Sequence, residues 1–383
     1  MKKYKFLWVI SATCIILSIF YSFVDASQTN TPRVKLTTNP PLEKILPFRA
    51  QSKQQKPVTL TLQALDASSQ PLKGAKIGLE ILTPSKTPWF STDFPIVEAT
   101  KLLKLETIAL DGKLEIQQML PIRGKYQLKA SVAPSVENTF ASYQEILTLN
   151  VSENPVKFKY FGVVAAILLG LGLLGGLVIG GQQQTQEGEI APYNVRLLLS
   201  GLIVVAIAAL LFINISAEVA DAHGNEEHSV KILPAVQKTQ GLEVRLQGDK
   251  QATVGKLASY TVQAIDTATQ QPVKDVAFQV KAIDLEDNLP MFSYKAISDT
   301  NGQLTWQEQF FDGAPHKIEV EVTPANASSR QFQPLKVEKE VEVEGIAPPL
   351  YTRFISLFYF TSIVGIGMAI GLWLQHKRIQ KAV

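Results

Sequence analysis

The sequence contains only one cysteine, Cys14, among its 383 residues. A disulfide or a CxxC zinc or redox site needs paired thiols, so these kinds of site are excluded. Histidine is scarce as well, with four in the chain, and this leaves few members for a nucleophile–base pair. A GxSxG elbow, a P-loop and a GxGxxG fingerprint after a strand are all missing. The sequence therefore predicts a protein that is not an enzyme and has no cofactor.

An excess of charge of either sign is also missing. The 37 Lys and Arg residues are nearly balanced by 34 Asp and Glu residues, which gives a formal net charge of +3. The chain has no long stripe of Lys and Arg with interleaved aromatic residues, which is the usual footprint of a nucleic-acid surface. We therefore expect no nucleic-acid partner.

Long apolar runs are what the sequence does contain. Two of them, 160–181 and 197–217, have no charged residue, and each is long enough for a helix that crosses ~30 Å of hydrocarbon. The polar loop 182–196 between them is too short for a domain, so we expect the two helices to be antiparallel neighbours. Whatever precedes this hairpin then lies on the same side of the membrane as whatever follows it.

Both ends of the chain carry further apolar runs with basic flanks. A basic n-region precedes the run 6–24, and residues 1–26 are expected to be either a signal peptide or an uncleaved N-terminal anchor helix. The run 354–375 is followed by the basic tail 376–383. Because positive flanks stay inside, the tail is expected in the cytoplasm and the chain from residue 27 outside.

The segments 27–156 and 218–350 share an alternating apolar–polar pattern with turn residues between the runs, which is typical of half-buried strands. They also match each other in order at a spacing of ~200 residues, which indicates a duplicated helix–sandwich–helix unit. About seven short strands in ~100 residues predict an immunoglobulin-like sandwich in each segment. The expected fold class is thus all-β, with two duplicated Ig-like sandwich modules combined with transmembrane α-helices. The matched stretches are 62–66 with 262–266, 71–79 with 272–280, 111–114 with 301–304, 128–134 with 318–324, and 145–151 with 336–343.

The run 71–79 and its counterpart 272–280, which is followed by Ser298-Asp299-Thr300-Asn301-Gly302-Gln303-Leu304, carry a family resemblance. They resemble bacterial Ig-like and transthyretin-like domains, and among these most of all the YtkA/FixH type. The resemblance covers the two exterior segments and implies short, membrane-anchored periplasmic sandwiches. The Met and His copper ligands of related copper-carrier sandwiches have no convincing counterpart, because Met119 and Met291 stand alone.

Together these patterns predict a complete domain plan. In order, it consists of a signal peptide or anchor helix (1–26), an exterior sandwich (27–156), a transmembrane helix (157–181), a short cytoplasmic loop (182–196), a second transmembrane helix (197–217), a second exterior sandwich (218–350), a third transmembrane helix (354–375) and a basic cytoplasmic tail (376–383).

Glycines recur at helical spacing in two of the predicted membrane helices. Gly172, Gly176 and Gly180 share one face of the first, and Gly367 and Gly371 are similarly spaced in the last. Small residues let helix backbones approach closely, and such packing drives association in lipid. The partner helix is expected either within this chain or in another subunit.

Metal-capable side chains gather in the segment 221–228, which follows the second membrane run. His223, Glu226, Glu227 and His228 could hold zinc or copper there. No HExxH motif or second cluster supports them, so a solvated linker is the competing interpretation. The acidic run 284–288 lacks the spacing of an EF-hand loop and is expected to be a turn.

Two functions follow from these observations. The first is a non-enzymatic, multi-pass protein of a bacterial inner membrane, surrounded by the lipid bilayer. Its two Ig-like modules lie on the periplasmic face and bind partners or assemble a membrane complex with a membrane protein, a periplasmic protein or a second copy. The alternative is a periplasmic metal-handling accessory protein, for copper, zinc or nickel delivery or as a transporter subunit, that uses His223 and His228.

Overall fold

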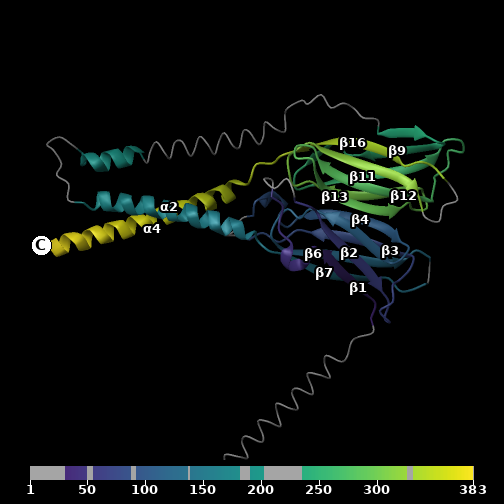
Figure 1. Cartoon of the computed structure of the whole chain (residues 1–383), viewed down its shortest axis with the longest axis horizontal. Coiled ribbons are helices and arrows are strands. Elements are labelled where there is room, and N and C mark those ends of the chain that lie inside the picture. Colours follow the sequence, from purple (N-terminus) through teal and green to yellow (C-terminus); the bar gives the residue numbers. More distant parts are fainter. Residues whose placement is uncertain are drawn as a thin grey trace, which may run out of the picture.

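The computed structural model describes residues 31–49, 55–87, 92–136, 139–181, 190–201, 235–325 and 331–382. These ranges form a β-rich body at one end of the molecule and a pair of long helices at the other (Figure 1). At this level the predicted class, β-sandwich structure combined with apolar helices, agrees with the structure. The first 26 residues and most of the run 197–217 lie outside the described residues, although 193–201 is helical.

The chain builds two halves that follow the same order. The first half contains β1 (Arg33–Asn39), the 3-10 turn η1 (Leu42–Lys44), β2 (Val58–Leu65), β3 (Ala75–Leu82), η2 (Pro95–Val97), β4 (Lys101–Ala109), β5 (Lys113–Gln118), β6 (Gly124–Pro134) and β7 (Tyr143–Val151), and ends in helix α2 (Pro155–Ile179). The second half contains β8 (Val236–Thr239), β9 (Leu242–Gly248), β10 (Gln251–Thr253), β11 (Leu257–Asp266), β12 (Val276–Asp284), β13 (Leu289–Ile297), β14 (Gln303–Gln309), β15 (His316–Pro324) and β16 (Leu335–Glu344), and ends in helix α4 (Leu350–Ala382).

Local sequence explains these strands and turns. In β2, alternate side chains from Val58 to Ala64 are buried, as the period of two requires for a strand with one face on the core. The β4–β5 hairpin turns at Gly112, which has a positive φ of 70° and lies against the backbone of Leu72. The carboxylate of Asp66 accepts hydrogen bonds from the backbone N–H groups of Ser68 and Gln70, which fixes the turn after β2.

The strands pair into two long series that each run through both halves. One series is β1-β2-β5-β13-β12-β15-β16-β10, and the other is β8-β9-β11-β14-β4-β3-β6-β7. All pairings are antiparallel except β10 with β16. A single bridge between Ile108 and Ile297 links the two series. Each sheet therefore begins in one half of the chain and ends in the other.

The junction between the halves exchanges equivalent strands. In the order of strands, β14 of the second half is equivalent to β5 of the first, and β13 is equivalent to β4. Strand β5 pairs with β13, and β14 pairs with β4. This is the reciprocal pattern of an isologous two-fold interface, here formed within one chain. It is the arrangement that a duplicated unit would produce, and the duplication itself stays a prediction.

Side chains from both halves also share one core. The cluster of buried apolar residues extends from Val34 in β1 to Val343 in β16. At the junction, the ring of Phe311 packs edge-on against Phe48 and Phe94, with centroids 5.2 and 5.5 Å apart. The backbone N–H of Met119 donates to the carbonyl oxygen of Met291 at 2.8 Å. We therefore expect the two halves to unfold as one unit.

A cavity in the first half should therefore also lower the stability of the second half against unfolding. Leu79 in β3 is 2% exposed, and Leu79→Ala is expected to cost ~2–5 kcal/mol. With Trp8, Trp89 and Trp373 replaced by Phe, the fluorescence of Trp306 in the second half reports denaturant unfolding. The Trp306 transition should move to lower denaturant in Leu79→Ala, whereas Leu110→Ala at an exposed position should leave it in place. If the denaturant midpoint of the Trp306 transition were the same in Leu79→Ala as in the parent chain, the halves would unfold separately.

Candidate functional site: a glycine-packed helix pair with a basic pocket at its base

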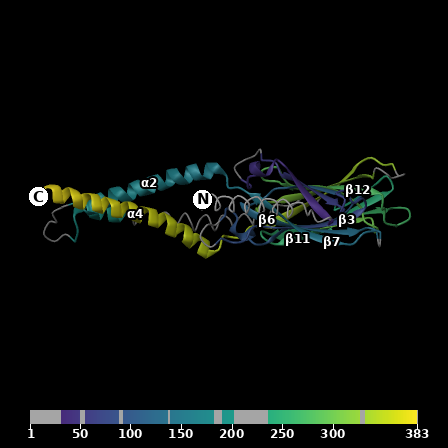
Figure 2. The same cartoon turned by 90° about the horizontal axis from the view of Figure 1, so that it is seen from below.

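Helices α2 and α4 leave the same end of the β-rich body, run in the same direction and make extensive contact (Figure 1). Seen from below, they start apart and converge toward the C-terminus (Figure 2). Because α2 follows β7 and α4 follows β16, which are equivalent strands, the two halves place their helices alike. The described partner of α2 is thus a helix of this chain, and it is parallel to α2.

Four glycines lie where the two helices meet. A Cβ atom on Gly172 would overlap the carbonyl oxygen of Val364, and one on Gly176 would overlap that of Met368. Gly367 and Gly371 face the carbonyl oxygens of Leu169 and Leu173 in the same way. The backbones are therefore in direct contact, and no larger side chain fits without separating the helices.

The remaining glycines of these helices behave differently. Gly180 lies at the end of the contact, where an added Cβ would be 3.1 Å from the Cβ of Gln375. Around Gly162, Gly170 and Gly365, an added Cβ would meet no described atom within 4 Å. The direct contact between the two backbones is therefore made at Gly172, Gly176, Gly367 and Gly371, and Gly180 lies at its edge.

The outer faces of the pair are apolar and uncovered in the described structure. In the most apolar 18-residue stretch of Pro155–Ile179, only 17% is buried, and in the corresponding stretch of Leu350–Lys381 only 11% is buried. Both helices are long and apolar enough to cross a membrane by length and composition. A soluble protein rarely leaves so large an apolar surface exposed.

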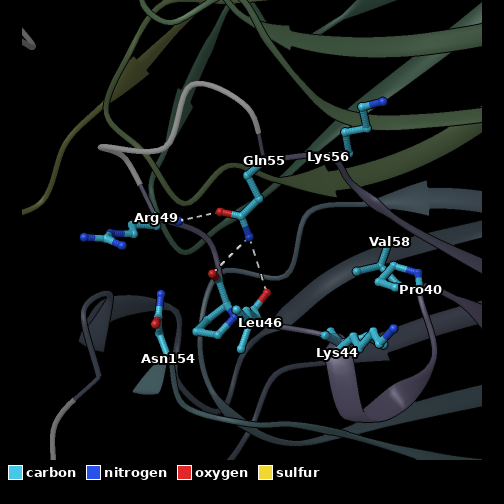
Figure 3. A pocket seen from close by; sticks show the side chains of 10 residues that line it. Pro40, Lys44, Leu46, Arg49, Gln55, Lys56, Val58 and Asn154 are labelled. Carbon is cyan, nitrogen blue, oxygen red and sulfur yellow. Dashed lines mark hydrogen bonds between the residues drawn. The ribbon is translucent and has the colours of Figure 1, made fainter. Parts of the chain in front are cut away.

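A basic pocket of about 250 Å³ lies at the base of α2. Its lining comes from the segment around η1, from the start of β2 and from Asn154, whose side chain caps α2 by accepting from the N–H of Val156 at 3.0 Å. Three cations, Lys44, Arg49 and Lys56, stand around it (Figure 3). The full lining is Pro40, Lys44, Ile45, Leu46, Pro47, Arg49, Gln55, Lys56, Val58 and Asn154.

A second feature, buried inside the second half, is a group of polar side chains. The Tyr260 and Tyr294 hydroxyls, the Trp306 indole N–H and one carboxylate oxygen of Glu308 have no hydrogen-bond partner among the described residues. The ring of Trp306 stacks on Tyr260 at 5.5 Å and meets Tyr294 edge-on at 6.3 Å.

The electrostatic effect of this burial is large. Burial raises the pKa of Glu308 to about 8, against a weaker opposite effect of Trp306. It also raises the pKa of Tyr294, to which the Glu308 charge adds. Burial therefore favours the neutral form of Glu308. Gln118 takes the same place in the first half, six residues after the glycine of its hairpin, and is just as buried.

The predicted metal ligands His223, Glu226, Glu227 and His228 lie outside the described residues, so the metal-handling alternative stays a prediction. Among the described residues, no group of three or more His, Cys, Asp or Glu side chains is placed to hold a metal ion. The acidic run 284–288 forms the turn between β12 and β13, as expected, with the buried carboxylate of Asp284 accepting from the N–H of Glu286 at 2.8 Å.

Sequence reasoning missed the basic pocket and the buried Glu308. The stretch 51–56 reads as a loop in the sequence, and only the fold brings Gln55 and Lys56 to the pocket that Asn154 also lines. Lys44, Arg49 and Lys56 within thirteen residues are the available signal for the pocket. For Glu308, the uncharged Gln118 at the matched position of the first half is the sequence feature that points to a buried place.

Comparisons with known proteins find no matching family model and no similar curated protein. Solved structures with partial likeness include copper-bound FetP of uropathogenic Escherichia coli strain F11, at 9% identity and a TM-score of 0.24, covering 30% of this chain and 99% of FetP. A DUF4426 family protein of Pseudomonas aeruginosa has 15% identity and a TM-score of 0.20, over 28% of this chain and 96% of that one. The CARDB domain of a Pyrococcus furiosus protein has 15% identity and a TM-score of 0.19, over 31% of this chain and 97% of the domain. The resemblance to the YtkA/FixH type stays a prediction.

Proposed function

We propose that this protein is a non-enzymatic membrane protein that displays its two-half β-structure on the exterior face for binding a partner or assembling a membrane complex. The observation that supports this most is the parallel pair α2 and α4, which leave one end of the β-structure with apolar outer faces. Two parallel helices that enter a membrane together hold both halves on one side of it.

The aromatic residues of α4 match the thickness of a bilayer. Phe354, close to the β-structure, is 65% exposed, and Trp373, toward the other end, is 55% exposed. Nineteen residues separate them, which corresponds to ~28 Å of helix and to the ~30 Å of a hydrocarbon core. Lys377 places its ammonium 4.0 Å from the centre of the Trp373 ring. Aromatic rings and a cation are the side chains that favour the membrane–water interface.

The full topology belongs to the same proposal. The loop 182–196 lies inside, the run 197–217 returns to the exterior as a further transmembrane helix, and the basic tail 376–383 lies in the cytoplasm. The order exterior, helix, loop, helix, exterior, helix, tail keeps both halves in one compartment. The junction between the halves supports this arrangement, because strands paired across it cannot be separated by a bilayer.

The partner-binding role is tested on the full chain in native membranes. After extraction in a mild detergent and purification, the chain is expected to elute with a mass above that of a monomer and to contain a second component, or a second copy, at constant stoichiometry. The same complex should persist in a Gly170→Leu variant, whose added side chain meets no described atom. Recovery of the chain as a lone monodisperse monomer would contradict the partner-binding role.

A further inference from the structure

The basic pocket at the base of α2 has no function in the account so far. We propose that it binds the phosphate group of an anionic phospholipid headgroup. This inference rests on the proposed membrane insertion of α2, and it adds a ligand of defined chemistry to the proposed function.

In the described part of the chain, no acidic side chain pairs with the cations around the pocket. Among the residues that the structure describes, Lys44, Arg49 and Lys56 form no ion pair, and the pocket lining contains no Asp or Glu. Several other cations of the first half are paired, as in Lys76 with Glu106 at 2.5 Å and Lys113 with Glu115 at 2.7 Å. An anion is therefore the ligand for which this pocket is suited.

Hydrogen bonds of Gln55 hold part of the pocket wall in place. The Gln55 amide oxygen accepts from the backbone N–H of Arg49 at 3.0 Å, and its amide nitrogen donates to the carbonyl oxygen of Pro47 at 3.0 Å (Figure 3). These bonds fasten the two ends of the loop to each other. In Figure 3 the charged ends of Lys44, Arg49 and Lys56 lie on different sides of the lining and point away from one another, so they surround the pocket with positive charge and do not meet at one point.

The position of the pocket selects a lipid over a soluble anion. Asn154 lines the pocket and is the residue immediately before α2. Phe158, Tyr160 and Phe161 follow within two turns and are more than half exposed, as expected for an interfacial aromatic belt. Lipid phosphates lie at the depth of such a belt. The apolar part of the lining, including the 37% exposed Leu46, can meet the glycerol and acyl portion.

The test measures lipid binding to the purified full chain by native mass spectrometry from detergent micelles. Phosphatidylglycerol, phosphatidylcholine and inorganic phosphate are titrated separately. The test variant combines Lys44→Gln, Arg49→Gln and Lys56→Gln. The control variant makes the same change of charge at exposed lysines on other surfaces, with Lys73→Gln, Lys274→Gln and Lys295→Gln. Thermal unfolding followed by circular dichroism shows that both variants fold.

We expect wild type to bind phosphatidylglycerol in preference to phosphatidylcholine. The test variant should bind phosphatidylglycerol about tenfold more weakly, because three of the charges that attract it are gone, while the control variant should match wild type. Inorganic phosphate should neither bind at comparable concentration nor displace the lipid. Equal lipid binding by the test variant and wild type would overturn the proposal. Binding of inorganic phosphate as tight as that of the lipid would overturn the lipid assignment in favour of a soluble anion.

The failure of this proposal is distinguishable from failure of the proposed function. Lipid binding is read from mass adducts in micelles, whereas membrane topology is read from the accessibility of engineered cysteines in intact membranes. A chain with the proposed topology and no pocket-dependent lipid adduct would remove the headgroup site alone.

Discussion

Replacing Gly172 and Gly176 together by leucine should strongly slow the formation of a disulfide between cysteines placed at positions 180 and 375. The cross-link is designed into a Cys14→Ser chain with Gly180→Cys and Gln375→Cys, where the Cβ of residue 375 lies 3.1 Å from a Cβ on residue 180. Gly180 has a φ of −76°, so the backbone there accepts a side chain, and the separation is a few tenths of an ångström below the ~3.5 Å lower end of the Cβ–Cβ range in natural disulfides.

The reason for the loss is steric. Leucine at 172 and 176 would place atoms in the positions of the Val364 and Met368 carbonyl oxygens, so α4 must move away. We expect the rate of cross-linking in membranes to fall about tenfold or more, which corresponds to at least ~1.4 kcal/mol of lost packing. Mass spectrometry of the fragments after protease cleavage between the helices measures the linked fraction.

Matched controls come from the same helices. Gly170→Leu with Gly365→Leu adds the same apolar bulk at sites without a described neighbour, and this pair should leave the cross-link unchanged. If the two double variants behaved alike, the glycine contact between α2 and α4 would not be what holds the helices together.

The second large effect is on the pH dependence of stability. The purified chain should become less stable as the pH rises from about 4.5 to about 8, and Glu308→Gln should remove most of this loss. The cause is the burial that raises the pKa of Glu308 to about 8 from its usual 4.5. Between these values the folded chain keeps a proton that the unfolded chain has released. Raising the pH therefore favours the unfolded state.

The size of the effect follows from the same two pKa values. The difference between about 8 and 4.5 corresponds to a loss of up to ~5 kcal/mol, fully reached above the higher value. Burial also raises the pKa of Asp312 to about 6, and the neighbouring Asp284 and Glu286 add to this. The smaller loss that remains in Glu308→Gln should therefore lie below about pH 6.

Denaturant unfolding of wild type and Glu308→Gln between pH 4 and pH 9 measures this difference. The variants should be similar at the acid end, and Glu308→Gln should be more stable by several kcal/mol above pH 8. Gln118 is an amide at the matched and equally buried place in the first half, which is why Gln is the replacement chosen for Glu308. Glu344→Gln on the exposed end of β16 is the control and should keep the wild-type pH profile. A Glu308→Gln profile parallel to wild type would contradict the assignment of a buried neutral carboxyl.

Local patterns were sufficient for the strands and for the long helices. The alternation in Val58–Leu65 and the turn at Gly112 are decided by residues close in sequence, so they can be read directly. Helices α2 and α4 follow from hydropathy in the same way. The spacing of Gly172, Gly176, Gly367 and Gly371 pointed to a packing face, but left open whether the partner was in this chain.

The arrangement of the halves could not be read from the sequence. Whether β5 pairs with β13 or remains an edge strand depends on surfaces that are far apart in the sequence. No local pattern specifies that Ile116 pairs with Tyr294. Glu308 lies in the other pairing between the halves, where β14 meets β4 with Glu308 opposite Leu103. The stretch Thr305-Trp306-Gln307-Glu308-Gln309 reads as a polar strand, and only the folded structure shows the burial that raises the pKa of Glu308.

The most direct measurement of the account is the accessibility of single cysteines to a membrane-impermeant maleimide in intact cells of a Cys14→Ser strain. Lys73→Cys and Lys274→Cys mark the same exposed turn in the two halves, and Gln380→Cys marks the C-terminal end of α4. We expect positions 73 and 274 to be labelled at equal rates and position 380 to be labelled only after the membrane is permeabilised. Labelling of one half without the other, or of position 380 in intact cells, would contradict this expectation.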